Sequence, residues 1–178
     1  MRVSGGSGLN SSNPVHFMPA EDYFTLIRSM LDETGQASVR VTGISMRPLL
    51  ENLRDSVIII KPEHLHIGDI VLFDRLNGRY ALHRVIRKRK DGFTMAGDNQ
   101  WFVERKLPYD QITGVVTSIN RKGRIISCRK LSMQIYAQVV VLLTMPRIYL
   151  YRLAKRTYRF IRIIGPHAGK GKTDGHQT

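Results

Sequence analysis

The first periodic stretch of the chain has apolar residues at helical spacing. In residues 20–34 the apolar side chains return every three to four positions, and Glu21 and Asp22 stand in what would be the first turn. Gly35 follows the last apolar position and is a common helix stop. The pattern predicts an N-terminal helix over residues 20–35. Its apolar positions are Phe24, Ile27, Met30 and Leu31.

After Gly35 the apolar residues form short β-branched runs, of which Val57-Ile58-Ile59-Ile60 is the clearest. Between the runs, Asn77-Gly78 and Asp91-Gly92 favour tight hairpin turns because these residue types tolerate positive φ. We therefore predict a mainly β fold, with a compact antiparallel β domain over residues 36–127. The other strand candidates are residues 39–41, 68–74, 80–88, 93–96 and 112–119.

A third pattern begins at Leu131. Residues 131–145 contain no charge, but these 15 residues are fewer than the roughly 20 that a membrane-spanning helix needs. Extending the stretch to Tyr151 includes Arg147, which would have to snorkel. Beyond it, basic residues share one helical face and apolar residues occupy much of the rest, which is typical of a membrane-surface helix. The basic residues are Arg152, Lys155, Arg156 and Arg159.

We therefore expect a helical region over residues 128–164 that lies on a membrane or is inserted in it. The alternative is a helical hairpin whose apolar side covers the β domain. Residues 1–19 and 165–178 are rich in glycine and polar residues, and we expect a disordered leader and a disordered tail. No secretory signal is visible in the first 20 residues.

Composition adds two constraints. Residues 1–120 carry 15 Lys and Arg against 13 Asp and Glu, whereas residues 121–178 carry 13 against 1. This asymmetry indicates a separate contact surface for anionic lipid or nucleic acid. The single cysteine, Cys128, excludes an intrachain disulfide and a cysteine-rich zinc site.

Candidate chemistry begins at Ser45, which follows a glycine turn and precedes Met-x-Pro. Serine is a weak nucleophile at neutral pH unless a neighbouring base takes its proton, and histidine suits that task. A carboxylate behind the histidine would stabilise the imidazolium. His83 and Asp98 supply these groups, in the order Ser, His, Asp. Taken singly, each residue also has a structural explanation: a capping serine, a buried strand histidine and a plain turn.

The order and spacing of five motifs resemble the superfamily of serine peptidases that includes type I signal peptidases and self-cleaving SOS-type repressors. The resemblance covers about residues 38–119 and implies a β-rich catalytic domain. The motifs are Ser45-Met46-Arg47-Pro48, Gly68-Asp69-Ile70-Val71, His83-Arg84-Val85, Gly97-Asp98-Asn99 and Gly114-Val115-Val116.

Bacterial signal peptidases and the repressors of this superfamily use lysine as base, whereas the endoplasmic-reticulum and archaeal signal peptidases use histidine in a His-Arg-Val context. The sequence resembles this histidine branch. The resemblance implies that Ser45 is the nucleophile and that His83 is the general base and then the acid. The branch has a second acid about six residues after the Gly-Asp-Asn aspartate, where Glu104 stands. Asp98 and Glu104 are both candidates to orient His83, and we prefer Asp98 because its motif is intact.

The resemblance also implies how the oxyanion is bound. Gly43 stands where signal peptidases often place a serine that donates to the oxyanion. The developing charge would then rely on the backbone N–H groups of Ile44 and Ser45, and loss of one such donor can cost about 10²–10³ in rate.

Substrate binding in this superfamily resembles strand addition, in which an extended peptide pairs with edge strands near the nucleophile. Val41, Thr42, Gly43 and Leu82 would supply those edges, with small residues preferred next to the cut. Met46 either lines the pocket, anchors in lipid or packs in the core.

The function we predict is a membrane-associated serine endopeptidase of signal-peptidase type that cleaves leader or signal segments from precursor polypeptides. We expect an anionic membrane surface as partner, no nucleic acid and no cofactor or metal, because His64 and His66 have no further ligands nearby. Two alternatives stay open: a self-cleaving regulator that contacts nucleic acid, and an inactive β domain that only binds peptides.

Overall fold

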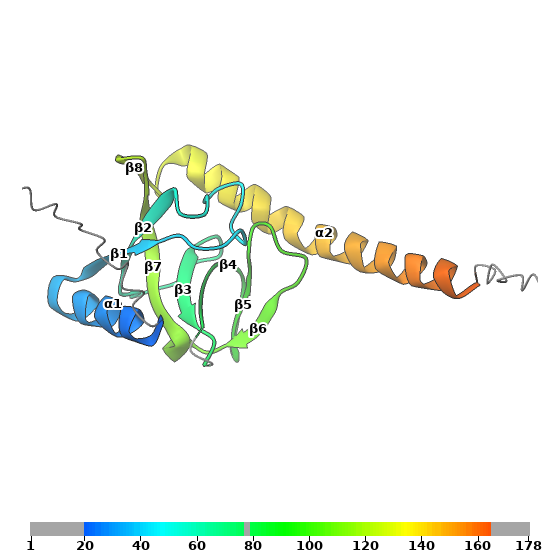
Figure 1. The fold of residues 1–178 in the computed structure, drawn as a ribbon, viewed down its shortest axis with the longest axis horizontal. Coiled ribbons are helices and arrows are strands. Elements are labelled where there is room, and N and C mark those ends of the chain that lie inside the picture. Colours follow the sequence, from blue (N-terminus) through cyan, green and yellow to red (C-terminus); the bar gives the residue numbers. More distant parts are fainter. Residues whose placement is uncertain (1–19, 77–78, 165–178) are drawn as a thin grey trace, which may run out of the picture.

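The computed structural model describes residues 20–76 and 79–164 as an N-terminal helix, a curved β-sheet and a long C-terminal helix (Figure 1). The expected disordered ends, residues 1–19 and 165–178, and the turn Asn77-Gly78 lie outside the described residues. The helices are α1 (Ala20–Thr34) and α2 (Leu131–Ile164), with a short 3-10 helix η1 (Tyr109–Gln111). The strands are β1 (Gln36–Arg40), β2 (Asp55–Ile60), β3 (Ile70–Asp74), β4 (Tyr80–Arg89), β5 (Gly92–Ala96), β6 (Glu104–Leu107), β7 (Ile112–Arg121) and β8 (Arg124–Ser127).

All eight strands belong to one antiparallel sheet, in which seven follow the order β1-β2-β7-β3-β4-β5-β6 and β8 pairs with β7. The predicted β-rich fold with an N-terminal helix and a C-terminal helix is therefore confirmed. The turn at Asp91-Gly92 joins β4 to β5, with Arg89 opposite Gly92. Gly92 has φ of 124°, and a Cβ there would lie 2.6 Å from the carbonyl oxygen of Leu107, so only glycine fits.

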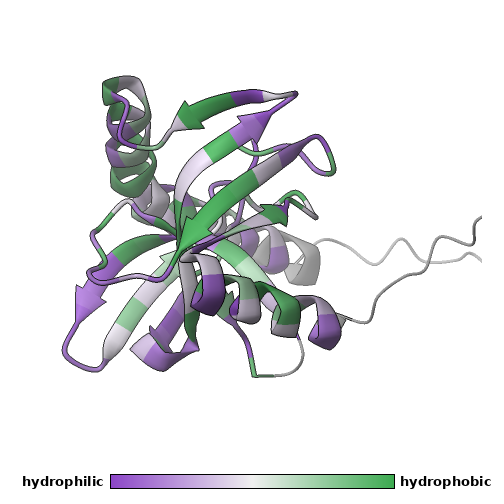
Figure 2. Ribbon diagram, turned by 90° about the vertical axis from the view of Figure 1, so that its left-hand side faces the viewer, coloured by the Kyte–Doolittle hydropathy of each residue, from purple (hydrophilic) through white to green (hydrophobic). Residues whose placement is uncertain are grey.

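The sheet buries both of its faces, and β3 shows why. Its side chains alternate, so that Ile70 and Leu72 join one apolar cluster while Val71 and Phe73 join another. The first cluster includes residues of α1, β1 and β2. The second includes residues of β5 and Ile112, the first residue of β7. Figure 2 shows the hydrophobic stretches in the middle of the strands and the polar stretches toward their ends. A strand buried on both faces reads as a continuous apolar run, as residues 70–73 do.

The sequence pattern missed two strands. β6 has the sequence Glu-Arg-Lys-Leu with one buried residue, and β8 is a four-residue strand with no fully buried residue. Neither has the apolar alternation that identifies a strand, because each lies at a margin of the sheet and is held by backbone pairing. The alternative of a C-terminal helical hairpin is wrong: α2 is a single helix of 34 residues with Pro146 inside it.

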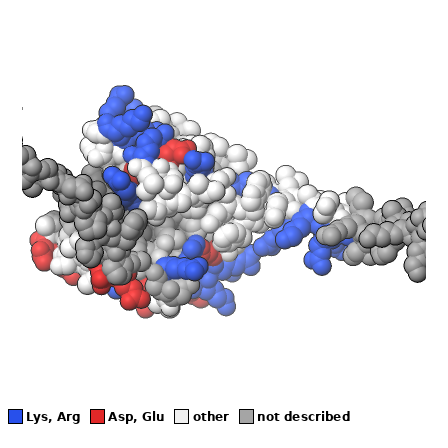
Figure 3. All heavy atoms as spheres, viewed as in Figure 1, with Lys and Arg blue, Asp and Glu red and all other residues white. Residues whose placement is uncertain are grey.

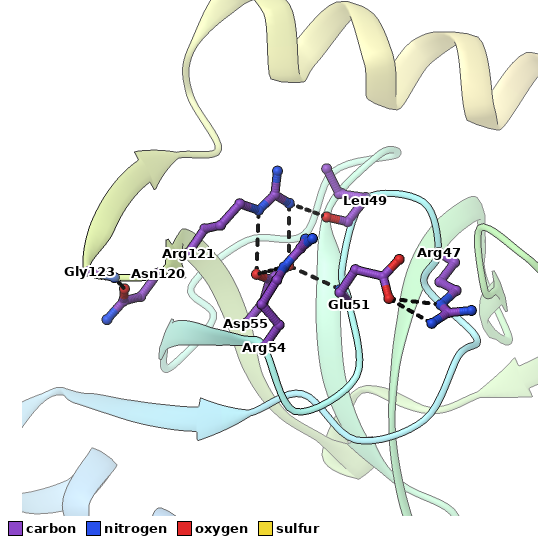
Figure 4. A network of polar contacts seen from close by, with 8 residues as sticks. All are labelled: Arg47, Leu49, Glu51, Arg54, Asp55, Asn120, Arg121 and Gly123. Atoms are coloured by element: carbon purple, nitrogen blue, oxygen red, sulfur yellow. Dashed lines mark hydrogen bonds and ion pairs between the residues drawn. The ribbon is translucent and has the colours of Figure 1, made fainter.

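The loop between β1 and β2 is fixed by Asp55, whose side chain is fully buried (Figure 4). Its carboxylate accepts hydrogen bonds from the Arg54 guanidinium at 2.9 Å and from the backbone N–H of Glu51 at 3.0 Å. Arg121 on β7 reaches the same carboxylate and also donates to the carbonyl oxygen of Leu49. Burial raises the pKa of Asp55, but these donors outweigh it and lower the pKa from 3.8 to about 2.

We predict that Asp55→Asn lowers the free energy of unfolding by about 2 kcal/mol at neutral pH, which is the linkage equivalent of this pKa difference. Because the pKa is lower in the folded state, this stability is present above about pH 4 and disappears as the pH falls toward 2. Urea unfolding of both proteins at pH 7 and pH 3 measures the effect. Equal differences between the two proteins at both pH values would contradict it.

Candidate active site

Ser45 lies in the loop between β1 and β2 and is half-buried. Its carbonyl oxygen accepts a 2.8 Å hydrogen bond from the backbone N–H of Asn99, and the Asn99 side chain donates to the carbonyl oxygen of Ile44 at 3.3 Å. A Cβ on Gly97 would lie 2.5 Å from the Ser45 carbonyl oxygen, so this close approach requires glycine. The Gly-Asp-Asn turn therefore supports the loop that carries the serine.

Met46, the next residue, is 2% exposed and belongs to the apolar core, although it also contributes to the wall of the cavity beside Ser45. Core packing is thus the main role of Met46. Its burial anchors the loop one residue after Ser45.

His83 lies on β4, opposite Val71 of β3, and is 1% exposed. Its Nδ1 is 3.3 Å from Oε1 of Glu104 on β6, although the angle does not satisfy a hydrogen bond. Neither ring nitrogen has a hydrogen-bond partner among the described residues. A buried imidazole without a partner is uncommon, and it leaves the hydrogen-bonding capacity of both ring nitrogens unused.

Glu104 stands between His83 and Arg75, and the Arg75 guanidinium donates to both of its carboxylate oxygens. Burial raises the pKa of Glu104, but the contacts with His83 and Arg75 outweigh it and lower the pKa from 4.5 to about 2. Glu104 is therefore ionised at neutral pH, as a carboxylate that stabilises an imidazolium must be.

Asp98 does not face His83, and the preference for Asp98 as its orienting group is wrong. The Asp98 carboxylate forms two hydrogen bonds with Arg84, at 2.9 and 2.7 Å, and accepts another from the Tyr136 hydroxyl at 3.2 Å. The physical reason is the alternation of side chains along β4. Neighbouring residues of a strand point to opposite faces, so His83 meets Glu104 and Arg84 meets Asp98.

A cavity of about 470 Å³ brings Ser45 and His83 to the same space. Residues 39–43 and 80–83 form two of its walls, including the four expected substrate-strand residues Val41, Thr42, Gly43 and Leu82. Five further lining residues were not predicted from the sequence as part of the site: Tyr23, Phe24, Leu72, Arg75 and Gln100. The helical period of α1 indicated only that Phe24 packs inward, and its stacking on Tyr80 depends on the tertiary fold.

Both strand segments of this cavity have unpaired edges. β5 pairs with β4 only from Arg84 onward, so residues 80–83 have no strand on that side in the described part of the chain. At the other wall, the backbone of Val41 forms hydrogen bonds with the backbone of Leu53 and Asp55. The backbone of the next residue, Thr42, makes no hydrogen bond within residues 20–76 and 79–164. The N–H groups of Ile44 and Ser45 likewise donate to no described acceptor. Open edges and free amides are what strand addition and oxyanion binding require.

The first half of α2 holds the Gly-Asp-Asn turn in place. Tyr136 donates to Asp98, and Arg147 donates to the carbonyl oxygens of Asp98 and Gln100. The Arg147 guanidinium also lies 5.5 Å from the centre of the Trp101 ring, which stacks on Tyr151 of the same helix. Because the Gly-Asp-Asn turn supports the loop of Ser45, α2 is physically connected to Ser45.

No group of three or more His, Cys, Asp or Glu side chains that could hold a metal ion is found among the described residues. His66 is exposed, with Nδ1 3.6 Å from Asp69.

A serine and a buried histidine that share one cavity, with an ionised carboxylate behind the histidine, form the arrangement typical of serine peptidases. The model of the family described as Peptidase S24-like matches residues 2–117 of the 178 residues. The chain therefore belongs to the Peptidase S24-like family, which is part of the superfamily that the five motifs resemble. Membership of this family indicates a serine peptidase or a self-cleaving repressor fold, and some members of the family are inactive. No curated protein matches the chain significantly. Helix α2 lies beyond the matched residues.

We predict that Glu104→Gln lowers kcat for a peptide substrate by about 10³- to 10⁴-fold, because the neutral amide no longer stabilises the imidazolium. Asp98→Asn is the matched carboxylate-to-amide change. It should mainly destabilise the fold, by about 3 kcal/mol, since it breaks a buried ion pair. Steady-state kinetics and thermal unfolding of both variants separate the two effects. A Glu104→Gln protein with unchanged kcat would refute the assignment.

Proposed function

We propose that this protein is a membrane-associated serine endopeptidase of signal-peptidase type, which removes leader or signal segments from precursor polypeptides. The observation that carries the proposal is the shared cavity of Ser45 and His83, with Oε1 of Glu104 3.3 Å from Nδ1 of the imidazole. The family match supports a peptidase, and the histidine base favours the signal-peptidase branch over the lysine-dependent repressors.

In the proposed reaction, the Ser45 hydroxyl attacks the scissile carbonyl while Nε2 of His83 takes its proton. The N–H groups of Ile44 and Ser45 stabilise the oxyanion, and Glu104 stabilises the imidazolium. His83 then gives the proton to the leaving amine, which departs with the C-terminal part of the precursor. Water next attacks the acyl-serine, with His83 again as base, and releases the N-terminal segment.

The open strand edges support the proposed substrate class. An extended polypeptide that pairs with residues 39–43 and 80–83 would lie across the cavity with its acyl portion next to Ser45. The side chains of such a strand alternate, so every second one would enter the cavity. Tyr23, Phe24 and Tyr80 line this cavity, and the bulk of their side chains favours small residues beside the cut.

The exposed face of α2 supports a membrane location. The stretch Leu131–Arg159 is long and apolar enough to cross a membrane, and most of it is not buried by the rest of the protein. The C-terminal part of α2 projects past the sheet (Figure 1), and Figure 3 shows Lys and Arg along the projecting part. Large apolar side chains are exposed on α2: Leu131, Ile135, Val139, Leu142, Leu143, Met145, Tyr149, Leu150, Tyr151, Leu153 and Tyr158.

We predict that Ser45→Ala and His83→Ala each abolish cleavage of co-expressed candidate precursors while the thermal unfolding transition remains cooperative. Each removes a group that the covalent step needs, so the residual rate should fall by at least about 10⁴-fold. Ser132→Ala on α2 and His64→Ala in an exposed loop are the matched controls. Mass spectrometry of the precursors measures the cuts. Undiminished processing by either Ser45→Ala or His83→Ala would reject the peptidase assignment.

A membrane partner predicts co-flotation of the full chain with liposomes that contain phosphatidylglycerol. Leu142→Asp should abolish flotation, because an aspartate in the middle of an inserted helix costs about 3 kcal/mol. Ile125→Asp, an equivalent change at an exposed position of β8, should leave flotation unchanged. A gel shift with duplex DNA at the same salt concentration tests the alternative partner. DNA binding without flotation would instead support the self-cleaving regulator, since phosphate contacts use Lys and Arg.

A further inference from the structure

A second cavity, of about 620 Å³, also borders Ser45. It shares Gly43, Ser45 and Gln100 with the first cavity, which Ser45 and His83 line and which we call the catalytic cavity. The two cavities therefore meet at Ser45. Its remaining walls come from the turn that follows Asp98 and from α2, which supplies Tyr151 and Lys155. The family model matches residues 2–117, whereas α2 begins at Leu131. One wall of this cavity therefore comes from a helix that the family model does not cover.

The walls of the second cavity are mostly apolar and aromatic. Ile44, Trp101 and Phe102 are each about half exposed, which is unusual for side chains of this size so close together. Trp101 is held in place, since its ring stacks on Tyr151 with a centroid distance of 5.1 Å and lies beside the Arg147 guanidinium. A fixed aromatic wall favours a bulky apolar side chain as occupant, because little ordering remains to be done on binding.

The charge that lines the second cavity is positive only. Lys155 is the only lining residue that is charged at neutral pH, and no carboxylate is among the lining residues. A carboxylate of the occupant would therefore meet a cation and no opposing charge.

We propose that the second cavity binds the polypeptide segment immediately C-terminal to the scissile bond, and that it selects a bulky apolar side chain next to an acidic residue. The proposal rests on the proposed function, which places the acyl portion of the substrate along the strand edges of the catalytic cavity. The chain beyond the cut must then leave past Ser45, into the space bounded by Phe102 and Lys155. Continuity with Ser45 favours a polypeptide over a lipid as occupant.

Cleavage specificity tests the proposal with the full chain in detergent micelles. The substrates are synthetic peptides with alanine before the cut and either Phe-Glu or Phe-Lys in the first positions after it. We expect the unaltered protein to prefer Phe-Glu about two- to fivefold in kcat/KM, the range for an exposed ion pair. Lys155→Glu should reverse this preference, whereas Arg156→Glu, the same charge change outside the cavity, should keep it. Phe102→Ala should reduce the preference for Phe over Ala after the cut by about tenfold.

Binding can be measured without cleavage, because Trp101 is the only tryptophan of the chain and lines the cavity. In the Ser45→Ala protein, a Phe-Glu peptide should shift the Trp101 fluorescence at lower concentration than a Phe-Lys peptide. Lys155→Glu in the same background should invert that order.

The outcomes separate the two proposals. Cleavage that depends on Ser45 but shows no preference after the cut, together with unchanged Trp101 fluorescence, would overturn the second cavity as a substrate site and leave the peptidase intact. Binding of the peptides without any cleavage would support the cavity and reject the catalytic proposal. A fluorescence shift with phosphatidylglycerol vesicles but with neither peptide would identify a lipid as the occupant and overturn the inference.

Discussion

The ion pair between Arg84 and Asp98 is the contact on which the site depends. Both side chains are almost completely buried, at 3% and 1% exposure, and two charges can be buried only when they are paired and hydrogen-bonded. Arg84 also donates to the carbonyl oxygen of Gly68, and Asp98 accepts from Tyr136. The pair therefore joins β4, the loop before β3, the turn at residue 98 and helix α2 at one point. His83 and Asn99, the sequence neighbours of the two residues, reach the catalytic cavity and the Ser45 loop.

Helix α2 takes part in the site as well as in the proposed membrane contact. Its inner face supplies Tyr136 and Arg147 to the turn that supports Ser45, while its outer face is exposed and apolar. The same helix then forms one wall of the second cavity through Tyr151 and Lys155. An element that contacts both the turn and a lipid surface would place the scissile bond at a defined height above that surface. In the proposed function, precursor segments held at the same surface would then meet Ser45 already oriented.

Several features of the site could be predicted because they are local. Ser45 and His83 were candidates from their residue types and their order, and Glu104 from the family resemblance. The structure brings His83 to Glu104 and to the cavity of Ser45. The strands β2 to β5 and β7 were visible as apolar runs, since each buries at least one face. β6 was missed because its residues are mostly charged, and it was this strand that carried the carboxylate beside His83.

The sequence by itself determined which residues can do chemistry and which segments can bury an apolar face, because both follow from side-chain type and from periods of two or 3.6 residues. Only the tertiary structure decided which carboxylate faces the imidazole, because that depends on the pairing of β5 with β6 and on the face of β4 to which each side chain points. It likewise decided that Trp101 and Tyr151, 50 positions apart in the chain, stack beside Ser45. Contacts of this kind arise from packing between distant segments, which no local pattern records.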